Sequence, residues 1–523
     1  MPTLDWIGKK KVVNHHLDVP FKVLNKQYTF SADGKAQDSE NKIIHGDNLE
    51  ALKALLPEYE GKIKCIYIDP PYNTGNENWI YNDNVNDPRI KKWLGEIVGK
   101  EGEDLSRHDK WLCMMYPRLK LLQKLLSEDG AIFISIDDTE QANLKLICDE
   151  IFGIDNFVGM ITWESTTQPT NVGNAKYNLQ KKVEPIFLYV KNGEKKFLVK
   201  TLESENKYPH NGKLGKCRFE IIEKSDAGGY NRETMKFPIL GQLPREGKRW
   251  QIGKETADEL VKNNRIEIVD GIVKKAVYPE DELDKIQFEP FWSHFSAEKY
   301  GTAQRGKDLL TKIMGKSIGF DTVKPIGLLE ALFSHFPKDS IILDSFAGSG
   351  TTAHAILSMN KADSGNRKFI LIEMMDYAES ITAERVNRVI SGYGIDKDKT
   401  EGLGGDFNFY ELGEPLLVDG LLNEKVDVSN IREYIWFTET HSKLLTNLQT
   451  TDNEYFLGKN NDAGYWFYYK KNEETCLNYE FLSTMKTKAD QYIIYADVCR
   501  LPDSFLKEHN IVFKKIPREI QKF

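Results

Sequence analysis

A short apolar segment that ends at two prolines constrains the fold of this chain more than any other feature. Residues Ile63 to Ile68 have the character of a buried parallel strand, and Asp69-Pro70-Pro71-Tyr72 follows at once. The prolines fix the backbone, remove two amide donors and place Asp69 in an extended conformation. The sequence therefore predicts a rigid elbow at the carboxyl end of a strand, where open α/β sheets bind their ligands.

This elbow offers groups that suit a flat molecule carrying an amine. The Asp69 carboxylate and the Pro70 carbonyl can accept the two amine hydrogens, and the Tyr72 ring can stack on the face of the molecule. An ordinary rigid turn after a strand is the alternative interpretation of the same four residues.

The tetrapeptide resembles the signature of the DNA amino-methyltransferases. The resemblance implies that Asp69, Pro70, Pro71 and Tyr72 form a catalytic site for an exocyclic base amine. Such an amine is a poor nucleophile because its lone pair is delocalised into the ring. A carboxylate that accepts its hydrogens localises the lone pair, and the benefit is greatest in the transition state.

A glycine-rich turn follows another predicted strand, Ser340 to Leu343, and leads into a helix from about Thr352 to Met359. Such a turn lets the backbone approach a ligand and directs free amides at an anion. The next predicted strand, Lys368 to Ile372, ends in an acid that is well placed to bind ribose hydroxyls. The candidate cofactor-binding residues of this region are Asp344, Phe346, Ala347, Gly348, Gly350, Thr351, Thr352 and Glu373.

Two cofactors fit this turn when it is taken alone. Gly348-x-Gly350-x-x-Ala353 with a later acid also matches a nicotinamide-dinucleotide fold. S-adenosyl-L-methionine needs the same ribose carboxylate, and its methionine carboxylate would lie at the helix start near Thr351. The elbow at Asp69 has no purpose in a dehydrogenase, so the two motifs together favour S-adenosyl-L-methionine.

The order of the two motifs indicates a circular permutation. In the usual methyltransferase sheet the glycine turn lies on the first strand and the Asp-Pro-Pro-Tyr on the fourth, whereas here the elbow comes about 275 residues earlier. The order resembles the β class of these enzymes. Asp47 ends the strand before the elbow, so we expect it to accept a hydrogen bond from the cofactor's adenine. A plain helix cap is the alternative for Asp47.

Further segments resemble the modification subunits of type III restriction systems, over roughly residues 1–410. In that family a Lys-Pro pair precedes the helix that packs on the cofactor strand, so Lys324 and Pro325 are expected to line the methionine end. The resemblance also implies a homodimer and a helicase-nuclease restriction subunit as partners. The matching segments are Asp5 to Lys9, Tyr72 to Gly75, the Trp111 helix with Ser135 to Asp138, and Thr322 to Pro325.

The pattern of the chain predicts a parallel α/β sheet with an insertion and a small α/β appendage, and the resemblance implies that this is a Rossmann-like methyltransferase sheet with the insertion between its halves. The segment Asn171 to Trp250 carries seventeen lysines and arginines against nine acids, although the whole chain has a net charge of −8. This basic segment is the candidate DNA contact; a solvated, loop-rich surface is the alternative. We expect an arm (1–40), a catalytic half (41–164), a target-recognition insertion (165–320), a cofactor half (321–405) and a C-terminal appendage (406–523).

Composition excludes several other classes. No apolar run approaches ~18 residues, so no membrane span is expected. The first residues lack a secretion signal, which favours a cytoplasmic location. The six cysteines are scattered, with no close Cys-Cys or Cys-His pair, so no zinc site is expected.

The expected function is methylation of the N6 amine of an adenine flipped out of double-stranded DNA. Cytosine-N4 methylation uses nearly the same pocket, but that resemblance usually has serine in place of Asp69. A non-catalytic DNA-binding subunit that keeps the fold is an alternative of a different class. Methylation of RNA or protein is a further alternative, although aspartate rather than asparagine at position 69 disfavours a glutamine substrate.

Overall fold

The computed structural model divides the chain into two compact units, Met1–Lys195 with Trp292–Phe523, and Lys196–Phe291. The residues that it describes are 3–74, 92, 95–96, 107–168, 179–193, 200–201, 208–226, 232–282, 288–289, 291–320, 322–418, 420–444, 452–471 and 473–516.

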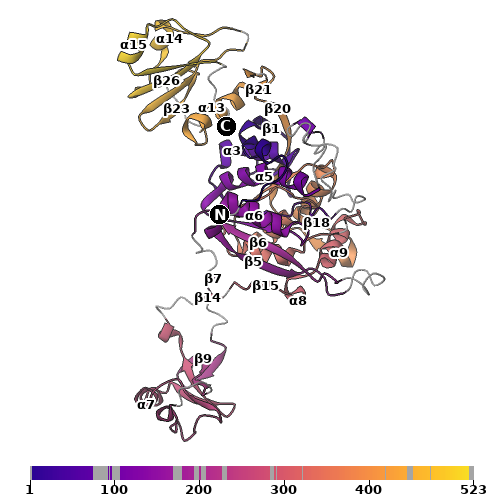
Figure 1. Ribbon diagram of the computed structural model, residues 1–523, viewed down its shortest axis with the longest axis vertical. Coiled ribbons are helices and arrows are strands. Elements are labelled where there is room, and N and C mark those ends of the chain that lie inside the picture. The colour runs from indigo at the N-terminus through magenta and orange to yellow at the C-terminus, as the bar shows by residue number, and fades with distance from the viewer. Residues whose placement is uncertain are drawn as a thin grey trace. The chain divides into compact units, whose positions relative to one another are not determined.

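A mixed sheet forms the centre of the larger unit (Figure 1), and it contains ten strands within the described residues. Strands β2, β17, β16, β3 and β4 run parallel, whereas β6 is antiparallel to both of its neighbours. The predicted Rossmann-like α/β sheet is confirmed. In spatial order the strands are β1 (Lys22–Ser31), β20 (Asp406–Pro415), β2 (Lys42–His45), β17 (Lys368–Glu373), β16 (Ile341–Asp344), β3 (Ile63–Ile68), β4 (Leu126–Ser135), β6 (Val183–Val190), β5 (Phe157–Glu164) and β15 (His294–Phe295).

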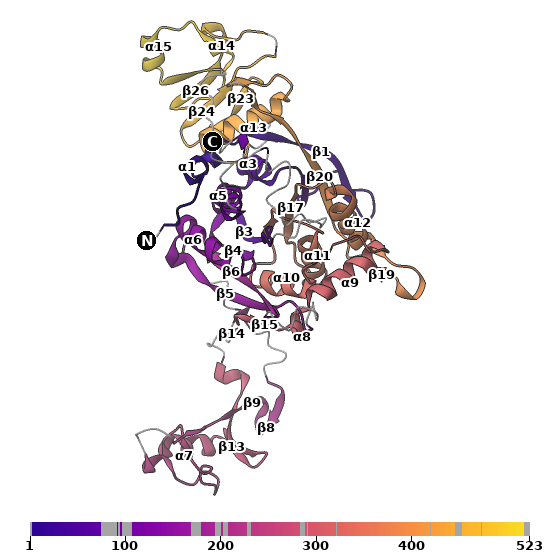
Figure 2. The ribbon, with the colours of Figure 1, turned by 45° about the vertical axis from the view of Figure 1, so that its right-hand side comes forward.

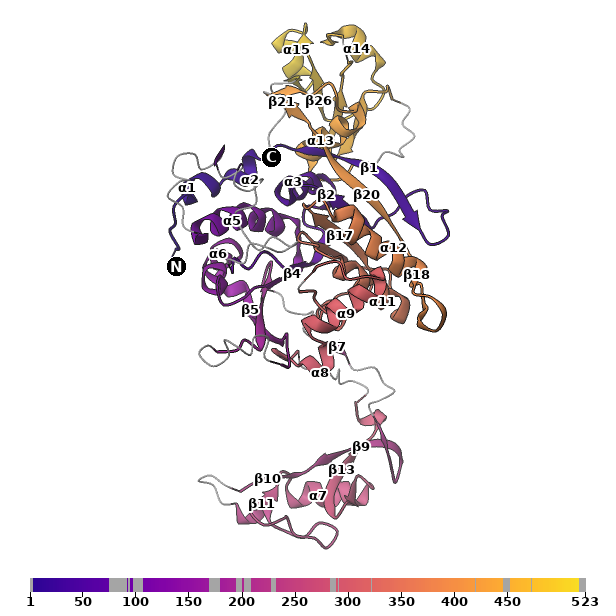
Figure 3. The same cartoon turned by 90° about the vertical axis from the view of Figure 1, so that its right-hand side faces the viewer.

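Helices cover both faces of this sheet (Figures 2 and 3), which explains why its central strands are apolar throughout. One face packs on α3 (Asn48–Tyr59), α5 (Arg107–Leu125) and α6 (Gln141–Phe152), and Ile66 and Ile68 point into that layer. The other face packs on α10 (Ile326–Phe333), α11 (Thr351–Asp363) and α12 (Glu384–Ser391). There the rings of Tyr67 and Phe133 meet Phe333 and Phe336 edge-on.

The strand that leads into the glycine turn lies directly beside the strand that leads into the elbow. Ile342 of β16 pairs with Cys65 of β3, and Leu343 pairs with Ile66, both in parallel register. On its other side β16 pairs with β17, which ends in Glu373. The carboxyl ends of these three strands therefore adjoin, although they are far apart in the sequence.

Both ends of the chain contribute strands to the main sheet. β1 lies within the segment 1–40 and pairs with β20, which lies at the start of the segment 406–523 and is parallel to β2. β6 lies within the segment 165–320, yet it pairs with β4 and β5 of the main sheet. The second compact unit accordingly begins only at Lys196.

The smaller unit has its own sheet and core. β12 (Ile266–Val269), β13 (Ile272–Val277), β9 (Gly215–Ile221) and β8 (His210–Gly212) form an antiparallel sheet, next to α7 (Lys254–Lys262). Trp250 is fully buried in a cluster with Phe237, Ile266 and Val273. Asp270 and Gly271 form the hairpin turn between β12 and β13, and both have a positive φ.

The C-terminal segment has a second α/β arrangement, in which β23 (Phe456–Asn460), β24 (Ala463–Phe467), β26 (Gln491–Ala496) and β28 (Ile511–Lys515) form a sheet. The chain reaches it through α13 (Val428–Thr440). Phe437 of α13 joins the core of the main sheet, whereas its neighbour Trp436 packs on Tyr465 of β24. The remaining helices and strands are α1 (Lys9–Val12), α2 (His15–Asp18), β7 (Lys200–Thr201), β10 (Glu223–Ser225), β11 (Lys248–Trp250), β14 (Phe288–Glu289), α8 (Ala297–Tyr300), α9 (Ala303–Met314), β18 (Gly392–Tyr393), β19 (Thr400–Glu401), β21 (Leu417–Val418), β22 (Leu421–Leu422), β25 (Cys476–Leu477), α14 (Tyr479–Thr484), β27 (Val498–Cys499) and α15 (Asp503–Glu508).

In the part of the chain that the structure describes, no helix has the length and apolar character needed to cross a bilayer. The same residues contain no cluster of three or more metal-binding side chains. All six cysteines are free thiols.

Candidate active site

The elbow after β3 is held by a side chain from α5. The indole nitrogen of Trp111 donates a hydrogen bond to the Pro71 carbonyl at 2.7 Å, and Trp111 itself is fully buried. Two residues further on, Asn73 has a φ of 58° and is buried, and its amide nitrogen donates to Glu140 at 2.5 Å. A left-handed asparagine, held by a buried acid, therefore follows directly after Tyr72.

Asp69 and Tyr72 belong to a compact cluster of charged and polar groups. The Tyr72 hydroxyl donates to Asp69 Oδ1 at 2.8 Å and lies 3.1 Å from Glu184 Oε2. The ammonium of Lys324 donates to Asp69 Oδ2 at 2.7 Å and to the Tyr72 hydroxyl at 2.9 Å. Its distance to Glu184 Oε2 is 3.5 Å. One ammonium therefore lies between two carboxylates.

Burial lowers the pKa of Lys324, but the nearby carboxylates of Asp69 and Glu184 raise it more, and the net shift is upward. The lysine is thus held in its charged form. The resemblance implied that Lys324 lines the methionine end of the cofactor, which stays a prediction; the structure shows its ammonium bound to the elbow. Pro325 occupies the N-cap position of α10.

The glycine turn is tied together by the acid that precedes it. Asp344 accepts a hydrogen bond from the amide of Phe346 at 3.0 Å and one from the Thr352 hydroxyl at 2.6 Å. Gly348 and Gly350 have φ values of 52° and 78°, which favour glycine. A Cβ on Gly350 would also lie 3.2 Å from the Thr382 carbonyl oxygen. The turn therefore needs glycine at this position for two independent reasons.

Glu373 closes the turn from the neighbouring strand. Its carboxylate accepts from the amide of Gly348 at 2.8 Å and from that of Met375 at 3.0 Å. Burial raises the pKa of Glu373 to about 7, although the amide hydrogen bonds oppose the shift. Burial likewise raises the pKa of Asp344 to about 7, against the hydrogen bonds from Thr352 and Phe346. The Asp69 carboxylate also raises the pKa of Asp344, by less than burial does.

An arginine that sequence reasoning missed supports the turn from α12. The fully buried Arg385 donates to the Ser349 hydroxyl at 2.9 Å, to the Ser349 carbonyl at 3.3 Å and to the Thr351 hydroxyl at 2.7 Å. Burial lowers its pKa to about 9. Arg385 also contacts the ring of His354, whose pKa is strongly lowered because His354 is buried too. Arg385 is a lone charged residue in an apolar helix face, a sequence signal that can also indicate a solvated arginine.

Asp47 caps a helix, and it also neutralises a buried arginine. Its Oδ1 accepts from the amides of Leu49 and Glu50 at the start of α3, and its Oδ2 lies 3.2 Å from Nη2 of Arg118. Arg118 also donates to Asn48, whose amide nitrogen donates to the Ser345 carbonyl at 3.1 Å. Helix α5 is therefore connected to the residue that follows β16. The capping alternative is confirmed, and a contact of Asp47 with the cofactor stays a prediction.

Sequence reasoning also missed Glu184, which contacts the elbow at Tyr72. It lies on the antiparallel strand β6, in register with Trp163 of β5. Its signal in the sequence is weak: one acid in the otherwise apolar run Val183 to Val190. The other turn residues predicted from sequence, Phe346, Ala347, Thr351 and Thr352, all lie around the loop and are largely buried.

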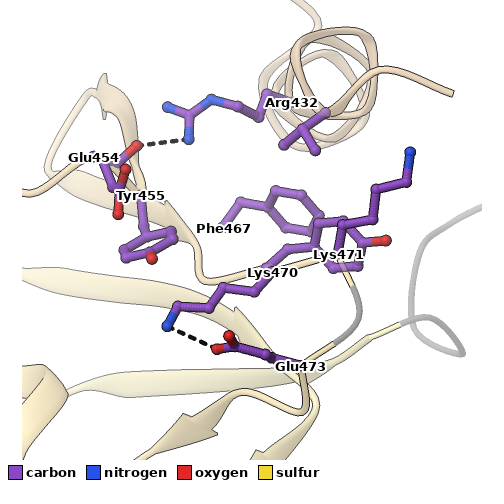
Figure 4. A pocket seen from close by; sticks show the side chains of 9 residues that line it. Arg432, Glu454, Tyr455, Phe467, Lys470, Lys471 and Glu473 are labelled. Atoms are coloured by element: carbon purple, nitrogen blue, oxygen red, sulfur yellow. Dashed lines mark hydrogen bonds and ion pairs between the residues drawn. The ribbon is translucent and has the colours of Figure 1, made fainter. Parts of the chain in front are cut away.

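A separate cavity of about 430 Å³ lies in the C-terminal segment (Figure 4). Two of its cations are engaged: Arg432 donates to the carbonyls of Glu454 and Phe456, and Lys470 pairs with Glu473 at 3.0 Å. No residue predicted from the sequence as a site residue lines it. The nine lining residues are Val428, Arg432, Glu454, Tyr455, Phe467, Tyr469, Lys470, Lys471 and Glu473.

Comparison with known proteins agrees with this geometry. The model of the DNA methylase family N6_N4_Mtase matches residues 63–384, a range that contains both the elbow and the glycine turn. The chain belongs to this family.

Three curated relatives are similar over most of the chain. The StyLTI Mod subunit of a type III restriction-modification enzyme from Salmonella typhimurium LT2 is 30% identical over 79% of the chain. The EcoPI Mod subunit of Escherichia phage P1 is 31% identical over 71%. The chain covers only 66% and 63% of the lengths of these two subunits. The type II methyltransferase M.KpnI of Klebsiella pneumoniae is 31% identical over 67% of the chain and 85% of its own length.

Proposed function

We propose that the chain is an S-adenosyl-L-methionine-dependent methyltransferase that modifies the N6 amine of an adenine in double-stranded DNA. One observation carries the proposal: the Asp69-Pro-Pro-Tyr72 elbow and the glycine turn follow the ends of the adjoining parallel strands β3 and β16. A base held at the elbow and a donor held at the turn would therefore meet at one edge of the sheet.

The residues at the turn fit the proposed cofactor. Glu373 ends β17 beside the turn and offers carboxylate oxygens for ribose hydroxyls. The hydroxyl of Ser345 is buried and has no hydrogen-bond partner among the described residues, which leaves a polar atom for a ligand to satisfy. The start of α11 at Thr351 supplies backbone amides suited to a carboxylate. When bound there, S-adenosyl-L-methionine supplies an electrophilic methyl group.

The elbow residues bind and orient the base. Asp69 and the Pro70 carbonyl accept the hydrogens of the amine, so that its lone pair is localised on nitrogen. The ring of Tyr72 stacks on the base. The hydrogen bond from Trp111 to the Pro71 carbonyl fixes the backbone between these groups. Proximity and orientation then account for most of the rate gain.

DNA is read by another part of the chain. The basic segment Asn171 to Trp250, most of which lies in the unit Lys196–Phe291, is proposed to contact phosphates and base edges. Candidate contacts on described residues include Arg218, Arg232, Arg245 and Arg249. The target adenine leaves the base stack to reach Asp69, at a cost of a few kcal/mol.

The identity to Mod subunits supports a role as the modification subunit of a restriction-modification system. A restriction subunit with helicase and nuclease activities, and a second copy of this chain, are the proposed partners. M.KpnI, which is also similar to this chain, is named a type II methyltransferase and not a Mod subunit. Co-purification with the restriction subunit tests this assignment.

A methyl-transfer assay tests the proposal directly. Purified protein is incubated with tritiated S-adenosyl-L-methionine and with DNA, RNA or protein, and modified nucleosides are then identified by mass spectrometry. The expected product is N6-methyladenine in DNA; N4-methylcytosine, or label in RNA or protein only, would contradict the proposal. Asp69→Ala is expected to abolish transfer while DNA binding is retained, which separates an enzyme from a non-catalytic DNA-binding subunit.

A further inference from the structure

Lys324 contacts the two groups that the proposed function assigns to the target base. Its ammonium donates to Asp69 Oδ2 at 2.7 Å and lies 5.2 Å from the centroid of the Tyr72 ring. An ammonium at this distance withdraws negative charge from the carboxylate and repels the positive charge that develops on a methylated amine. Asp69 can accept the amine hydrogens with its full negative charge only if a second anion shares the Lys324 ammonium.

Glu184 is the anion that the structure provides. Its Oε2 lies 3.5 Å from the Lys324 ammonium and 3.1 Å from the Tyr72 hydroxyl, from the side of strand β6. Only 9% of the Lys324 side chain and 19% of the Glu184 side chain is exposed, so water screens this pair weakly. The ring of Trp163, 5.7 Å from the ammonium, adds an apolar wall that confines the lysine between its two partners.

The charge balance of the cluster depends on Glu184. Asp69, Glu184 and Lys324 carry two negative charges and one positive charge, which leaves one negative charge for the reacting amine. Without the Glu184 charge, the lysine would neutralise Asp69 alone. The cluster would then be neutral at the point where the transition state becomes positive.

We propose that Glu184 is a positioning residue that draws the Lys324 ammonium from Asp69 when the target amine binds, an inference that rests on the proposed function. A small displacement of the ammonium suffices, because the two carboxylates already flank it. Asp69 then accepts the amine hydrogens with its full charge, and Lys324 forms a neutral pair with Glu184.

The test compares single-turnover rates of methyl transfer to DNA in the full-length protein. Glu184→Gln keeps the size of the side chain and removes its charge, and it is expected to slow transfer by about tenfold, with the KM for DNA nearly unchanged. Glu184→Asp, which keeps the charge, is expected to retain more activity than Glu184→Gln. Glu164→Gln is the matched control, because Glu164 lies on the neighbouring β5, is 20% exposed and pairs with Lys182 at 3.2 Å.

The double variant Glu184→Gln/Lys324→Met restores the single negative charge of the wild-type cluster. It is expected to be faster than Glu184→Gln, which a purely structural role of Glu184 would not produce. A double variant slower than Glu184→Gln, or a Glu184→Gln rate equal to that of Glu164→Gln, overturns the inference and leaves the proposed function intact. Absence of methyl transfer by the wild type would instead overturn the proposed function itself.

Discussion

The indole nitrogen of Trp111 lies 2.7 Å from the carbonyl oxygen of Pro71, and this hydrogen bond joins the long helix α5 to the elbow. The two prolines restrict the local backbone, but they cannot set the direction in which the elbow faces. The buried indole supplies that direction, because a fixed donor on α5 meets a fixed acceptor between Asp69 and Tyr72.

Trp111→Phe is expected to leave the Pro71 carbonyl without this donor, at a cost of about 1–3 kcal/mol in the free energy of unfolding. A looser elbow should lower the methyl-transfer rate by about 10- to 100-fold. Single-turnover kinetics and urea unfolding measure the two effects. Trp466→Phe is the control, since Trp466 is fully buried and its indole nitrogen has no hydrogen-bond partner among the described residues. A wild-type rate in Trp111→Phe would show that the bond does not position the elbow.

Two substitutions of Tyr72 separate its ring from its hydroxyl. Tyr72→Ala is expected to weaken base stacking by about 1–3 kcal/mol, on the general scale of base–aromatic contacts. Tyr72→Phe keeps the ring but removes the hydroxyl that contacts Asp69 and Glu184, so transfer should slow while base flipping is retained. Fluorescence of 2-aminopurine at the target position reports flipping. Transfer by Tyr72→Ala at the wild-type rate would exclude the stacking role.

Both motifs could be predicted because their chemistry is local. Four consecutive residues form the elbow, and the glycine turn requires Gly348 and Gly350 at positive φ just before a helix. The alternation of strands and helices predicted a parallel sheet, and the resemblance to a permuted methyltransferase implied that both motifs belong to it; in the structure β16 pairs with β3. Patterns of this kind determine the sheet because each strand must be buried on both faces.

The partners of the site residues could not be predicted in the same way. Glu184, Trp111 and Arg385 reach the two motifs from elements that only the tertiary fold brings close. The ammonium of Lys324 meets Asp69 across 255 positions of sequence, a contact that the sequence did not predict. For Asp47 the cap at α3 was one of two open interpretations, because a Gly-Asp turn before a helix fits both.

Arg385→Lys is expected to loosen the glycine turn, since one ammonium cannot reproduce the guanidinium hydrogen bonds to Ser349 and Thr351. Affinity for S-adenosyl-L-methionine should fall by about tenfold, the effect of losing roughly 1.4 kcal/mol. Isothermal titration calorimetry on the protein without DNA measures it. Arg432→Lys is the control, because Arg432 likewise donates to backbone carbonyls but lies in the C-terminal segment. Equal affinities in the two variants would contradict the role of Arg385.

The raised pKa values of Asp344 and Glu373 predict a pH dependence of stability. Each pKa is about 7 in the folded protein, against ordinary values of 3.8 and 4.5. Between these limits the folded state binds more protons than the unfolded chain, so the unfolding free energy falls as pH rises towards 8. The stabilisation is complete below about pH 4 and is lost as pH rises through about 7. Asp344→Asn should reduce the difference in thermal unfolding midpoint between pH 6 and pH 8, whereas Asp427→Asn, at a cap with a lowered pKa, should not.

The same titration should control cofactor binding with the opposite sign. Ionised Glu373 is the stronger acceptor for ribose hydroxyls, so affinity for S-adenosyl-L-methionine is expected to rise as pH increases from 6 to 8. Binding then favours the charged carboxylate and compensates part of the stability lost in the same interval. Glu373→Gln should bind the cofactor more weakly and with a flatter pH profile, which calorimetry at several pH values measures. An unchanged profile in this variant would mean that another group titrates, and Glu373 would no longer be the ribose ligand.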